Sequence, residues 1–348
     1  MKKFFGKAAA FVAGLLFSLA LAFPAFAQDR FLREFALNRT EGSLSFIWAS
    51  DLHYRSKSLY NHGITPANLK ALVRTAGEAE ADFLALTGDL IHGNDPRPAL
   101  ERDLREIARI LKGCSVPALV LPGNHDDGSK YAKRKGSADT LSTEEFFSLL
   151  GYAPPEGGRY YRDFPESKIR VICLNAADLP DKKDGSGMPL YPAIDNYAFR
   201  QEQLRWLAEK ALRFDEEGWA CLVLTHVDTE HVSPTARQKG FGHVNAVLQA
   251  FAKGEKAEIK DGEPDFEAEL TADFSSQGPG ELIGVFAGHV HKGGRRQKNG
   301  IQHLILGASY YNGLDYRGVV IDRKTKRIFL TDKKGKTETI SYQTRKSK

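Results

Sequence analysis

Short apolar runs recur along the chain, and each has the length of a strand buried on both faces. Five of these runs span 44–49, 82–87, 116–121, 219–225 and 282–287. Runs of four to eight apolar residues between polar or turn-forming residues are typical of strands in the interior of a sheet. We therefore predict a buried strand at each of these positions.

Apolar residues at helical spacing separate several of these runs. Thr65 and Pro66 predict an N-cap and a first helical position, and Asp95 and Pro96 repeat the same signal. The apolar positions that follow are Leu69, Leu72, Val73 and Ala76 after the first signal, and Leu100, Leu104, Ile107 and Leu111 after the second. A third helix is predicted around 204–212, because Leu204, Leu207 and Leu212 share a helical spacing.

Strands and helices alternate in the first third of the chain, which is typical of a layered α/β domain. Further along, 301–306 and 318–330 predict consecutive strands with a polar turn. No linker or internal repeat divides the chain, so we predict one domain over 44–335. The polar segment 28–43 and the basic tail 336–348 are expected to be loosely held.

The N-terminus is predicted to be a secretory signal over 1–27. Three lysines precede an apolar stretch, and the small residues Ala25 and Ala27 form a cleavage pattern. The stretch is shorter than the ~20 residues that a membrane span needs, and Pro24 interrupts it. We expect an exported chain, extracellular or periplasmic, that begins at Gln28 and keeps no stable membrane span. An uncleaved membrane anchor is the alternative.

Charge and cysteine content bear on the partners and on the disulfide content to be expected. The formal charge is +5, and removal of a signal with three lysines and no acidic residue leaves +2 (5 − 3). Basic runs such as 130–135 are typical of solvated faces, so we expect no nucleic acid as a specific partner. Cys114, Cys173 and Cys221 lie in or beside apolar runs, which favours buried thiols, although one disulfide stays open.

Polar residues of the metal-binding types follow each of the five runs. They stand in the blocks Asp51-Leu52-His53, Gly88-Asp89, Gly123-Asn124-His125-Asp126, His226, and Gly288-His289-Val290-His291. Carboxylates, neutral imidazoles and an amide oxygen bind the divalent ions that activate water. Sites in α/β sheets are built where strands end. The sequence therefore predicts a two-metal hydrolase site.

The order of these blocks resembles that of the calcineurin-like metallophosphoesterase superfamily, over essentially the whole mature chain. The resemblance implies an α/β fold, a layered α/β/β/α sandwich of two mixed sheets with flanking helices and a metal site at the strand C-terminal edges. It implies that Asp89 bridges two metals, which suits their usual separation of ~3.5–4 Å. One metal would be held by Asp51, His53 and His291, and the second by Asn124, His226 and His289.

His125 and Asp126 are the predicted catalytic residues. In the family, the histidine that matches His125 faces the scissile phosphate, so we expect it to protonate the leaving alkoxide or stabilise the transition state. Asp126 is expected to fix the tautomer of His125. The alternatives are a structural histidine and a turn carboxylate. Gly88, Gly123 and Gly288 are expected to allow sharp turns out of the strands.

The resemblance also bears on the metals and on the walls of the site. No tyrosine ligand of the purple acid phosphatase type stands beside Asp89, so two ordinary divalent ions such as Mn²⁺, Fe²⁺ or Zn²⁺ are expected. Asn175 stands where relatives often have an aspartate, at a position that is not a ligand. The insertions 127–158 and 228–280 follow predicted ligands and are expected to wall the site. A weaker prediction, that the residue lines the site or contacts the substrate, applies to Tyr54, Asn61, His62, His92, Lys130, His231, His243, Arg295, His303, Tyr310 and Tyr311.

The leading hypothesis is hydrolysis of a small phosphate ester by a metal-bridging hydroxide, as the resemblance implies. A phosphodiester or nucleotide is favoured, because the motifs bring a general acid and no extra arginine. The alternatives are a phosphomonoesterase and a secreted metal-binding interaction protein without catalysis. A metal-dependent amidase or lactamase is excluded, because its His-x-His-x-Asp-His cluster is absent.

Overall fold

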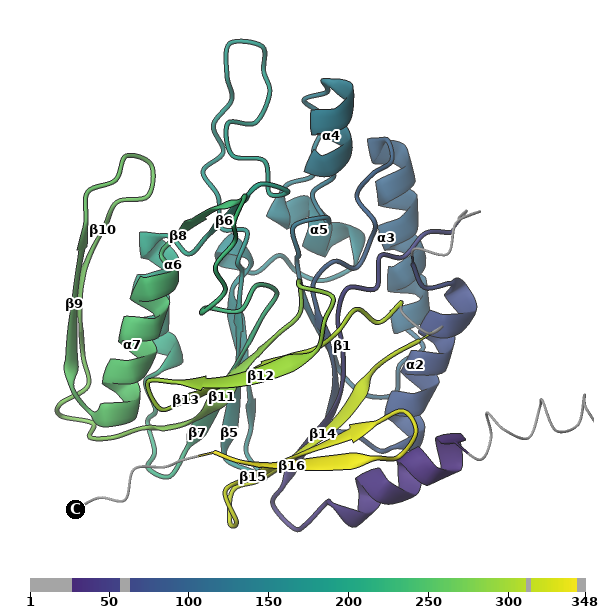
Figure 1. The fold of residues 1–348 in the computed structure, drawn as a ribbon, viewed down its shortest axis with the longest axis vertical. Helices are drawn as coiled ribbons and strands as arrows, with labels where there is room; N and C mark the ends of the chain where they lie inside the picture. The colour runs from purple at the N-terminus through teal and green to yellow at the C-terminus, as the bar shows by residue number, and fades with distance from the viewer. Residues whose placement is uncertain (1–26, 57–62, 311–313, 343–348) are drawn as a thin grey trace, which may run out of the picture.

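The computed structural model describes residues 27–56, 63–310 and 314–342. Two six-stranded sheets face each other and helices cover their outer faces, so the layers follow the order α/β/β/α (Figure 1). The predicted fold class is confirmed. The predicted signal 1–27 lies outside the described residues except for its last position.

The first sheet has the strand order β16-β15-β14-β1-β2-β3. Its strands span Leu44–Ala49 (β1), Phe83–Thr87 (β2), Ala118–Leu121 (β3), Arg317–Asp322 (β14), Arg327–Asp332 (β15) and Thr337–Ser341 (β16). β1, β2 and β3 pair in parallel, and the other three strands continue the sheet in antiparallel pairs. The C-terminal ends of β1, β2 and β3 therefore lie at one edge.

The second sheet has the strand order β12-β13-β11-β7-β5-β4. Its strands span Tyr160–Phe164 (β4), Ile169–Leu174 (β5), Ala220–Thr225 (β7), Glu281–Ala287 (β11), Gly294–Lys298 (β12) and Ile301–Ile305 (β13). The four inner strands are parallel and the two edge strands are antiparallel to their neighbours. The ends of β7 and β11 thus meet at a common edge as well.

Aromatic side chains hold the two sheets together. Phe46 of the first sheet stacks on Phe83 with 4.6 Å between ring centroids. Phe286 of the second sheet meets Phe46 and Trp48 edge-on at 5.7 and 5.3 Å. All four side chains are fully buried. Such large rings bury much apolar surface, so this contact sets the spacing at which loops from both sheets meet.

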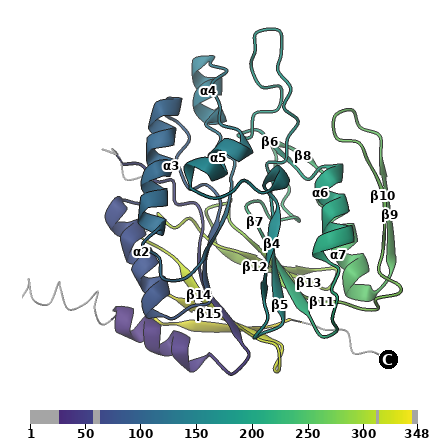
Figure 2. The same ribbon diagram turned by 180° about the vertical axis from the view of Figure 1, so that it is seen from behind.

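Helices cover the outer faces (Figures 1 and 2). On the first sheet lie α2 (Pro66–Glu78), α3 (Arg97–Leu111) and α5 (Thr143–Leu149), and on the second lie α6 (Gln201–Trp206), its π-helical continuation (Leu207–Ala211) and α7 (Phe241–Lys253). Smaller elements are α4 (Ser129–Lys135), a 3-10 turn (Glu156–Gly158), β6 (Asn196–Ala198), β8 (Arg237–Lys239), β9 (Lys256–Asp261) and β10 (Ala268–Asp273). The predicted strands and helices are confirmed.

The cap that begins the first helix is confirmed and the second is not. The Thr65 hydroxyl accepts from the Asn68 amide at 3.3 Å, and Asn68 Oδ1 accepts from the Thr65 amide at 3.1 Å. The cap predicted at Asp95 is wrong. α3 begins at Arg97 without a side-chain cap, because Asp95 instead accepts from the Arg55 guanidinium at 2.6 Å.

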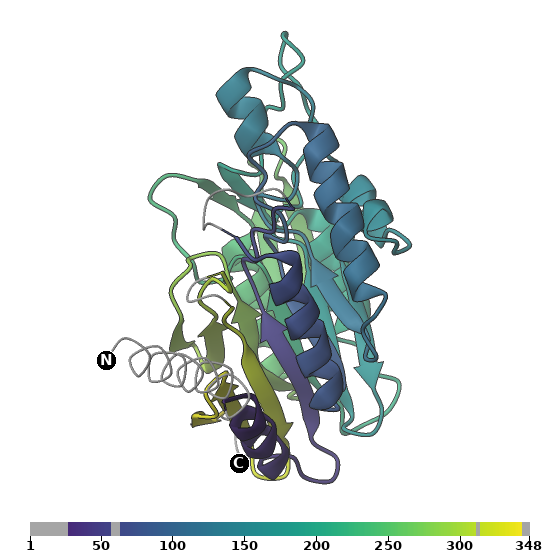
Figure 3. The ribbon, with the colours of Figure 1, turned by 90° about the vertical axis from the view of Figure 1, so that its right-hand side faces the viewer.

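The segment 28–43 is not loosely held, contrary to the sequence expectation. Residues 27–37 are helical and lie at the end of the molecule opposite α4 (Figure 3). Phe31 and Phe35 are fully buried, and Phe31 meets Tyr316 edge-on at 5.1 Å. Part of the predicted tail is likewise ordered, since β16 pairs with β15.

The insertion 228–280 does not wall the site as a whole, so that expectation is wrong for most of its length. α7 packs on the second sheet, and the β9–β10 hairpin covers α7 from outside (Figure 1). Its first residues alone approach the site, through His231. The three cysteines are free thiols, and two of them are buried. Every helix within the described ranges is too short or too polar for a membrane span.

Phe35→Ala tests the N-terminal helix. We expect the free energy of unfolding to fall by about 3 kcal/mol, because the change leaves a cavity beneath the helix. Leu37→Ala is the matched control, since Leu37 lies on the same helix and is 71% exposed. Chemical denaturation of the chain from Gln28 onward measures both. Equal stability of the two variants would contradict the packing of this helix.

Candidate metal centre

The seven predicted ligands converge on one region between the two sheets. They come from loops that follow five parallel strands: Asp51 and His53 after β1, Asp89 after β2, Asn124 after β3, His226 after β7, and His289 and His291 after β11. Parallel strands place these loops at the same edge, so residues up to 240 positions apart in sequence meet (51 to 291). The predicted location at the strand ends is confirmed.

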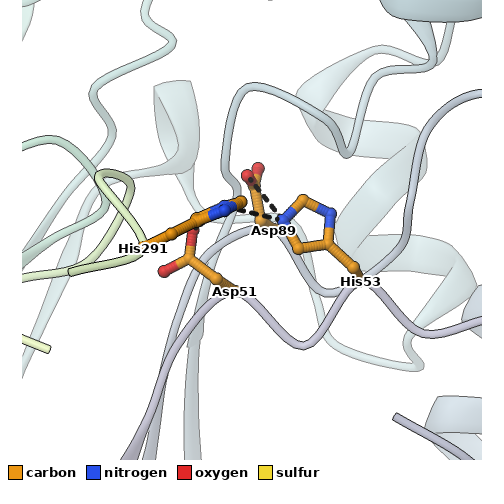
Figure 4. Close-up of side chains that lie close together, drawn as sticks. All are labelled: Asp51, His53, Asp89 and His291. Carbon is orange, nitrogen blue, oxygen red and sulfur yellow. Dashed lines mark hydrogen bonds and ion pairs between the residues drawn. The ribbon is translucent and has the colours of Figure 1, made fainter. Parts of the chain in front are cut away.

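The first cluster comprises Asp51, His53, Asp89 and His291, whose donor atoms all lie within 4.8 Å of one another (Figure 4). His53 Nε2 lies 3.0 Å from His291 Nε2 and 3.6 Å from Asp89 Oδ2. His291 Nε2 lies 3.3 Å from Asp51 Oδ1. Two imidazole nitrogens and two carboxylates thus point at a common centre.

This donor set fits a divalent cation. Asp51 is fully buried, and its Oδ1 accepts no hydrogen bond within the part of the chain that the structure describes. A buried carboxylate oxygen without a donor is costly unless a positive charge compensates it. Burial lowers the pKa of His53 well below its ordinary value, so its ring is neutral at pH 7 and has a free lone pair.

The second cluster is centred on the amide oxygen of Asn124. Asn124 Oδ1 lies 3.0 Å from His226 Nε2 and 3.0 Å from His289 Nδ1. His226 Nδ1 donates to the Thr87 carbonyl at 2.8 Å, which turns Nε2 toward the cluster. Burial lowers the pKa of His289 to about 3, whereas Asp89 overcomes burial and raises the pKa of His226 to about 10. His226 Nε2 therefore carries a proton in this structure, and that positive charge lies where a metal cation would be stabilised by Asp89 in the same way.

Asp89 joins the two clusters. Its Oδ2 faces His53 at 3.6 Å, and its Oδ1 faces His226 Nε2 at 3.4 Å. Burial opposes ionisation of Asp89, but the charges of His226 and His125 hold its pKa well below the ordinary value. The carboxylate is therefore ionised, with one oxygen directed at each cluster. This geometry fits the predicted bridging role.

The backbone at the site is strained. Asp51, His53, Asp89, His289 and His291 all have positive φ, between 46° and 73°. Such conformations are costly for residues other than glycine and persist only where the surroundings enforce them. Five of the ten non-glycine residues with positive φ in the described chain are thus predicted ligands.

The glycines beside the ligands serve two purposes. Gly88 has φ +89° and makes the predicted sharp turn. Gly123 and Gly288 do not have positive φ, so that interpretation is wrong for them, and close approach is the reason instead. A Cβ at Gly123 would lie 2.2 Å from Asp89 Oδ1, and one at Gly288 would lie 1.8 Å from Ser50 Oγ.

His125 is held with one ring nitrogen toward the metal clusters. Its Nδ1 donates to the His92 carbonyl at 2.7 Å, and its backbone amide donates to Asp89 Oδ1 at 2.8 Å. Its Nε2 lies 3.9 Å from Asp89 Oδ2, and the side chain is 12% exposed. The ring can therefore reach both the clusters and an incoming substrate, as a catalytic acid must.

The role predicted for Asp126 is wrong. Its carboxylate accepts from the backbone amides of Ile91 at 2.9 Å and Gly123 at 2.7 Å and does not contact the His125 ring. Burial and the nearby Asp89 charge raise its pKa to about 8. Asp126 thus joins the loops after β2 and β3, and the His92 carbonyl fixes the tautomer of His125.

Aromatic residues complete the surroundings. The Tyr310 hydroxyl lies 3.1 Å from His291 Nδ1, and the Tyr197 ring meets His289 edge-on at 4.9 Å. His92 lies 5.5 Å from the His53 ring and lines the site rather than a surface loop. The sequence offered no signal for Tyr197, because it follows a long irregular loop. His303 is buried against Asp228, and His243 lies on α7.

Two further features lie beside the site and not in it. Asn175 is buried, with its amide proton accepted by Gln203 Oε1 at 2.8 Å, and it contacts no predicted ligand. A cavity of about 700 Å³ is lined by Gly123 and Asp126 but by none of the seven ligands. Asn61, His62 and Tyr311 lie outside the described residues.

Comparisons with known proteins agree with this geometry. An uncharacterized protein of Schizosaccharomyces pombe is 31% identical over 150 residues, 42% of this chain and 26% of that protein. A probable cyclic nucleotide phosphodiesterase of Rhodopseudomonas palustris is 30% identical over 93 residues, 26% of this chain and 32% of that protein. The chain therefore spans less than a third of either relative.

A solved structure has a similar fold. It is a dimetal phosphatase from Danio rerio, with a TM-score of 0.57 at 17% identity over 86% of this chain and 99% of that one. The family model for calcineurin-like phosphoesterases matches residues 44–293, from the start of β1 to just beyond β11. Because this match includes every predicted ligand together with His125, the chain belongs to the calcineurin-like phosphoesterase family.

Proposed function

We propose that this chain is an exported two-metal enzyme that hydrolyses phosphodiesters or nucleotides. Membership of the family makes it a metal-dependent phosphoester hydrolase. The observation that carries the proposal of a two-metal site is the orientation of Asp89, whose two oxygens face different ligand clusters at 3.4 and 3.6 Å. His125 Nε2 stands beside the same carboxylate.

The cofactors we propose are two divalent ions. Oxygen and imidazole nitrogen donors without thiolates suit Mn²⁺, Fe²⁺ or Zn²⁺. Asp51, His53 and His291 would hold one ion, and Asn124, His226 and His289 would hold the other, with Asp89 shared. When bound, such ions activate water and offset the negative charge that gathers on the phosphoryl oxygens.

His125 is the residue we propose as general acid. Its Nδ1–H is engaged by the His92 carbonyl at 2.7 Å, so Nε2 faces the site and delivers a proton when the ring is in its doubly protonated imidazolium form. A leaving alkoxide is a strong base and departs faster when a proton is delivered to its oxygen. This assistance matters most for esters of poorly acidic alcohols.

The preference for a diester or nucleotide rests on two supports. One relative of similar sequence is named a probable cyclic nucleotide phosphodiesterase, over 93 residues. Among the residues that the structure describes, no arginine is a predicted ligand or is bonded to one, and a singly charged diester needs less cationic assistance than a doubly charged monoester. A phosphomonoesterase is the nearest alternative.

Export is proposed from the lysine-led apolar N-terminus and the Ala25-Phe26-Ala27 pattern. A small phosphate ester is then the partner, with no specific nucleic acid and no stable membrane span after cleavage. A secreted metal-binding protein without catalysis is the alternative from another class. It is disfavoured because His125, which has no need to contact a metal, is also held toward the clusters.

The substrate class is tested with bis-para-nitrophenyl phosphate and para-nitrophenyl phosphate. We expect the Mn²⁺-loaded chain from Gln28 onward to cleave the diester with the higher kcat/KM, and chelator to abolish both reactions. A higher kcat/KM for the monoester would favour the phosphomonoesterase. Bound metal without turnover on either ester, or on a panel of nucleotides, would favour the binding protein.

Asp89→Asn tests the shared ligand. Loss of one negative charge between two cations should lower the metal content from about two ions per chain to one or fewer, with little activity left. Elemental analysis after gel filtration measures the metal. Asp195→Asn is the matched control, because Asp195 pairs with the exposed Lys133 and not with a predicted ligand. Unchanged metal content in the Asp89 variant would contradict the bridging role.

His125→Ala separates catalysis from metal binding. We expect full metal content and a kcat lowered by about 10²- to 10⁴-fold, the usual range for a general acid. The loss should be larger for an alkyl ester than for a nitrophenyl ester, because the alkoxide needs the proton more. His243→Ala on α7 is the control. An equal loss on both esters would argue against proton donation.

A further inference from the structure

The short helix α4 carries four basic side chains; Lys135 is exposed at its C-terminal end, and Lys130, in its first turn, is the one that is partly buried. Lys133 bonds to Asp195, and Arg134 bonds to Asn94 Oδ1 at 2.9 Å. Lys130 is partly buried, yet it makes no hydrogen bond or ion pair with any residue that the structure describes. A partly desolvated ammonium without a counter-charge is costly, so this position suits an anion that comes from outside the chain.

The backbone places Lys130 on the same rim as His125. Its neighbour Tyr131 donates a backbone hydrogen bond to the Gly93 carbonyl at 3.2 Å. Gly93 in turn packs so closely on His125 that a Cβ there would lie 2.0 Å from the His125 carbonyl oxygen. The first turn of α4, the loop around Gly93 and the His125 loop therefore form one packed unit.

Electrostatic effects agree with this placement. Burial is the largest cause of the lowered pKa values of His92 and His125, and the positive charge of Lys130 adds to it in both. Burial likewise lowers the pKa of Lys130, while the Asp89 carboxylate opposes the change. Lys130 thus lies within electrostatic reach of the acid and of the shared ligand. The other nearby cation, Arg55, is already paired with Asp95 at 2.6 Å.

The opposite rim has a different character. Beyond His289 lie Tyr197 and His231, whose rings meet that of His289 at 4.9 and 5.2 Å. Val232 is 82% exposed and Val290 39% exposed on this side. The partly buried Lys130 therefore lies on the α4 rim, next to His125, whereas aromatic and imidazole rings pack against His289.

We propose that Lys130 binds an anionic group on the leaving alcohol, so that the enzyme prefers phosphate esters whose leaving group carries a carboxylate or a further phosphate. The inference rests on the proposed function, because the role of His125 as general acid defines which side of the substrate leaves. The preference completes the substrate class: a nucleotide with a second phosphate has such a leaving group, whereas a simple alkyl or aryl ester does not.

Two esters of nearly the same shape test this inference. The leaving groups of the diesters methyl 4-carboxyphenyl phosphate and methyl 4-carbamoylphenyl phosphate differ in one negative charge. For Lys130→Met we expect kcat/KM to fall about 10- to 100-fold on the carboxylate ester, the range of one charge-assisted hydrogen bond, and to stay near wild type on the amide ester. Lys130→Arg should keep most of the preference. Lys133→Met is the matched control and should leave both rates unchanged.

Other results would overturn the inference. An equal loss on both esters would mean that Lys130 contacts the scissile phosphate or only supports the fold, and no loss on either would mean that it contacts no substrate. If the wild-type enzyme cleaves neither ester, the proposed function fails for such substrates. The role of Lys130 is then tested separately, by the binding of the two esters. Equilibrium dialysis of the metal-loaded protein must then show tighter binding of the carboxylate ester, lost in Lys130→Met. Equal binding of the two esters would refute the role of Lys130.

Discussion

The burial of one carboxylate, that of Asp89, is the constraint on which the arrangement of the site depends. The side chain is 1% exposed, and an anion so far from water must be met by donors or positive charge. The His125 amide donates to it at 2.8 Å, and the rings of His53 and His226 face its two oxygens. Loops after β1, β2, β3 and β7 are therefore held together by the need to compensate a single charge.

The two-sheet architecture makes this meeting possible. The aromatic contact of Phe286 with Phe46 and Trp48 fixes the sheets face to face, and the parallel strands end at a shared edge. Bringing the ligands together strains the backbone, since five of them adopt positive φ. Buried apolar layers on both sides of each sheet supply the stability that holds those loops in strained conformations.

Local patterns in the sequence were sufficient to predict the strands, the Thr65 cap and the set of ligands, because each depends on neighbouring residues or on positions at strand ends. Interactions between segments far apart in the chain could not be predicted from such local patterns. Asp95 bonds to Arg55 across two loops instead of capping its own helix. Phe31 and Phe35 stand in a polar segment, and Tyr316, the ring that Phe31 meets, lies almost three hundred residues away. Asp126 was adjacent to His125 in sequence, but its carboxylate points at other backbone amides.

The closeness of Gly123 and Gly288 to neighbouring side chains has an evolutionary consequence. At either position even a single methyl group would collide with Asp89 or Ser50, whereas the ligands themselves could be exchanged for residues of similar size. Activity can thus be lost through positions that touch neither metal nor substrate. In descendants of such an enzyme that have taken up other roles, a side chain at one of these glycines would record the loss of function even where all seven ligands survive.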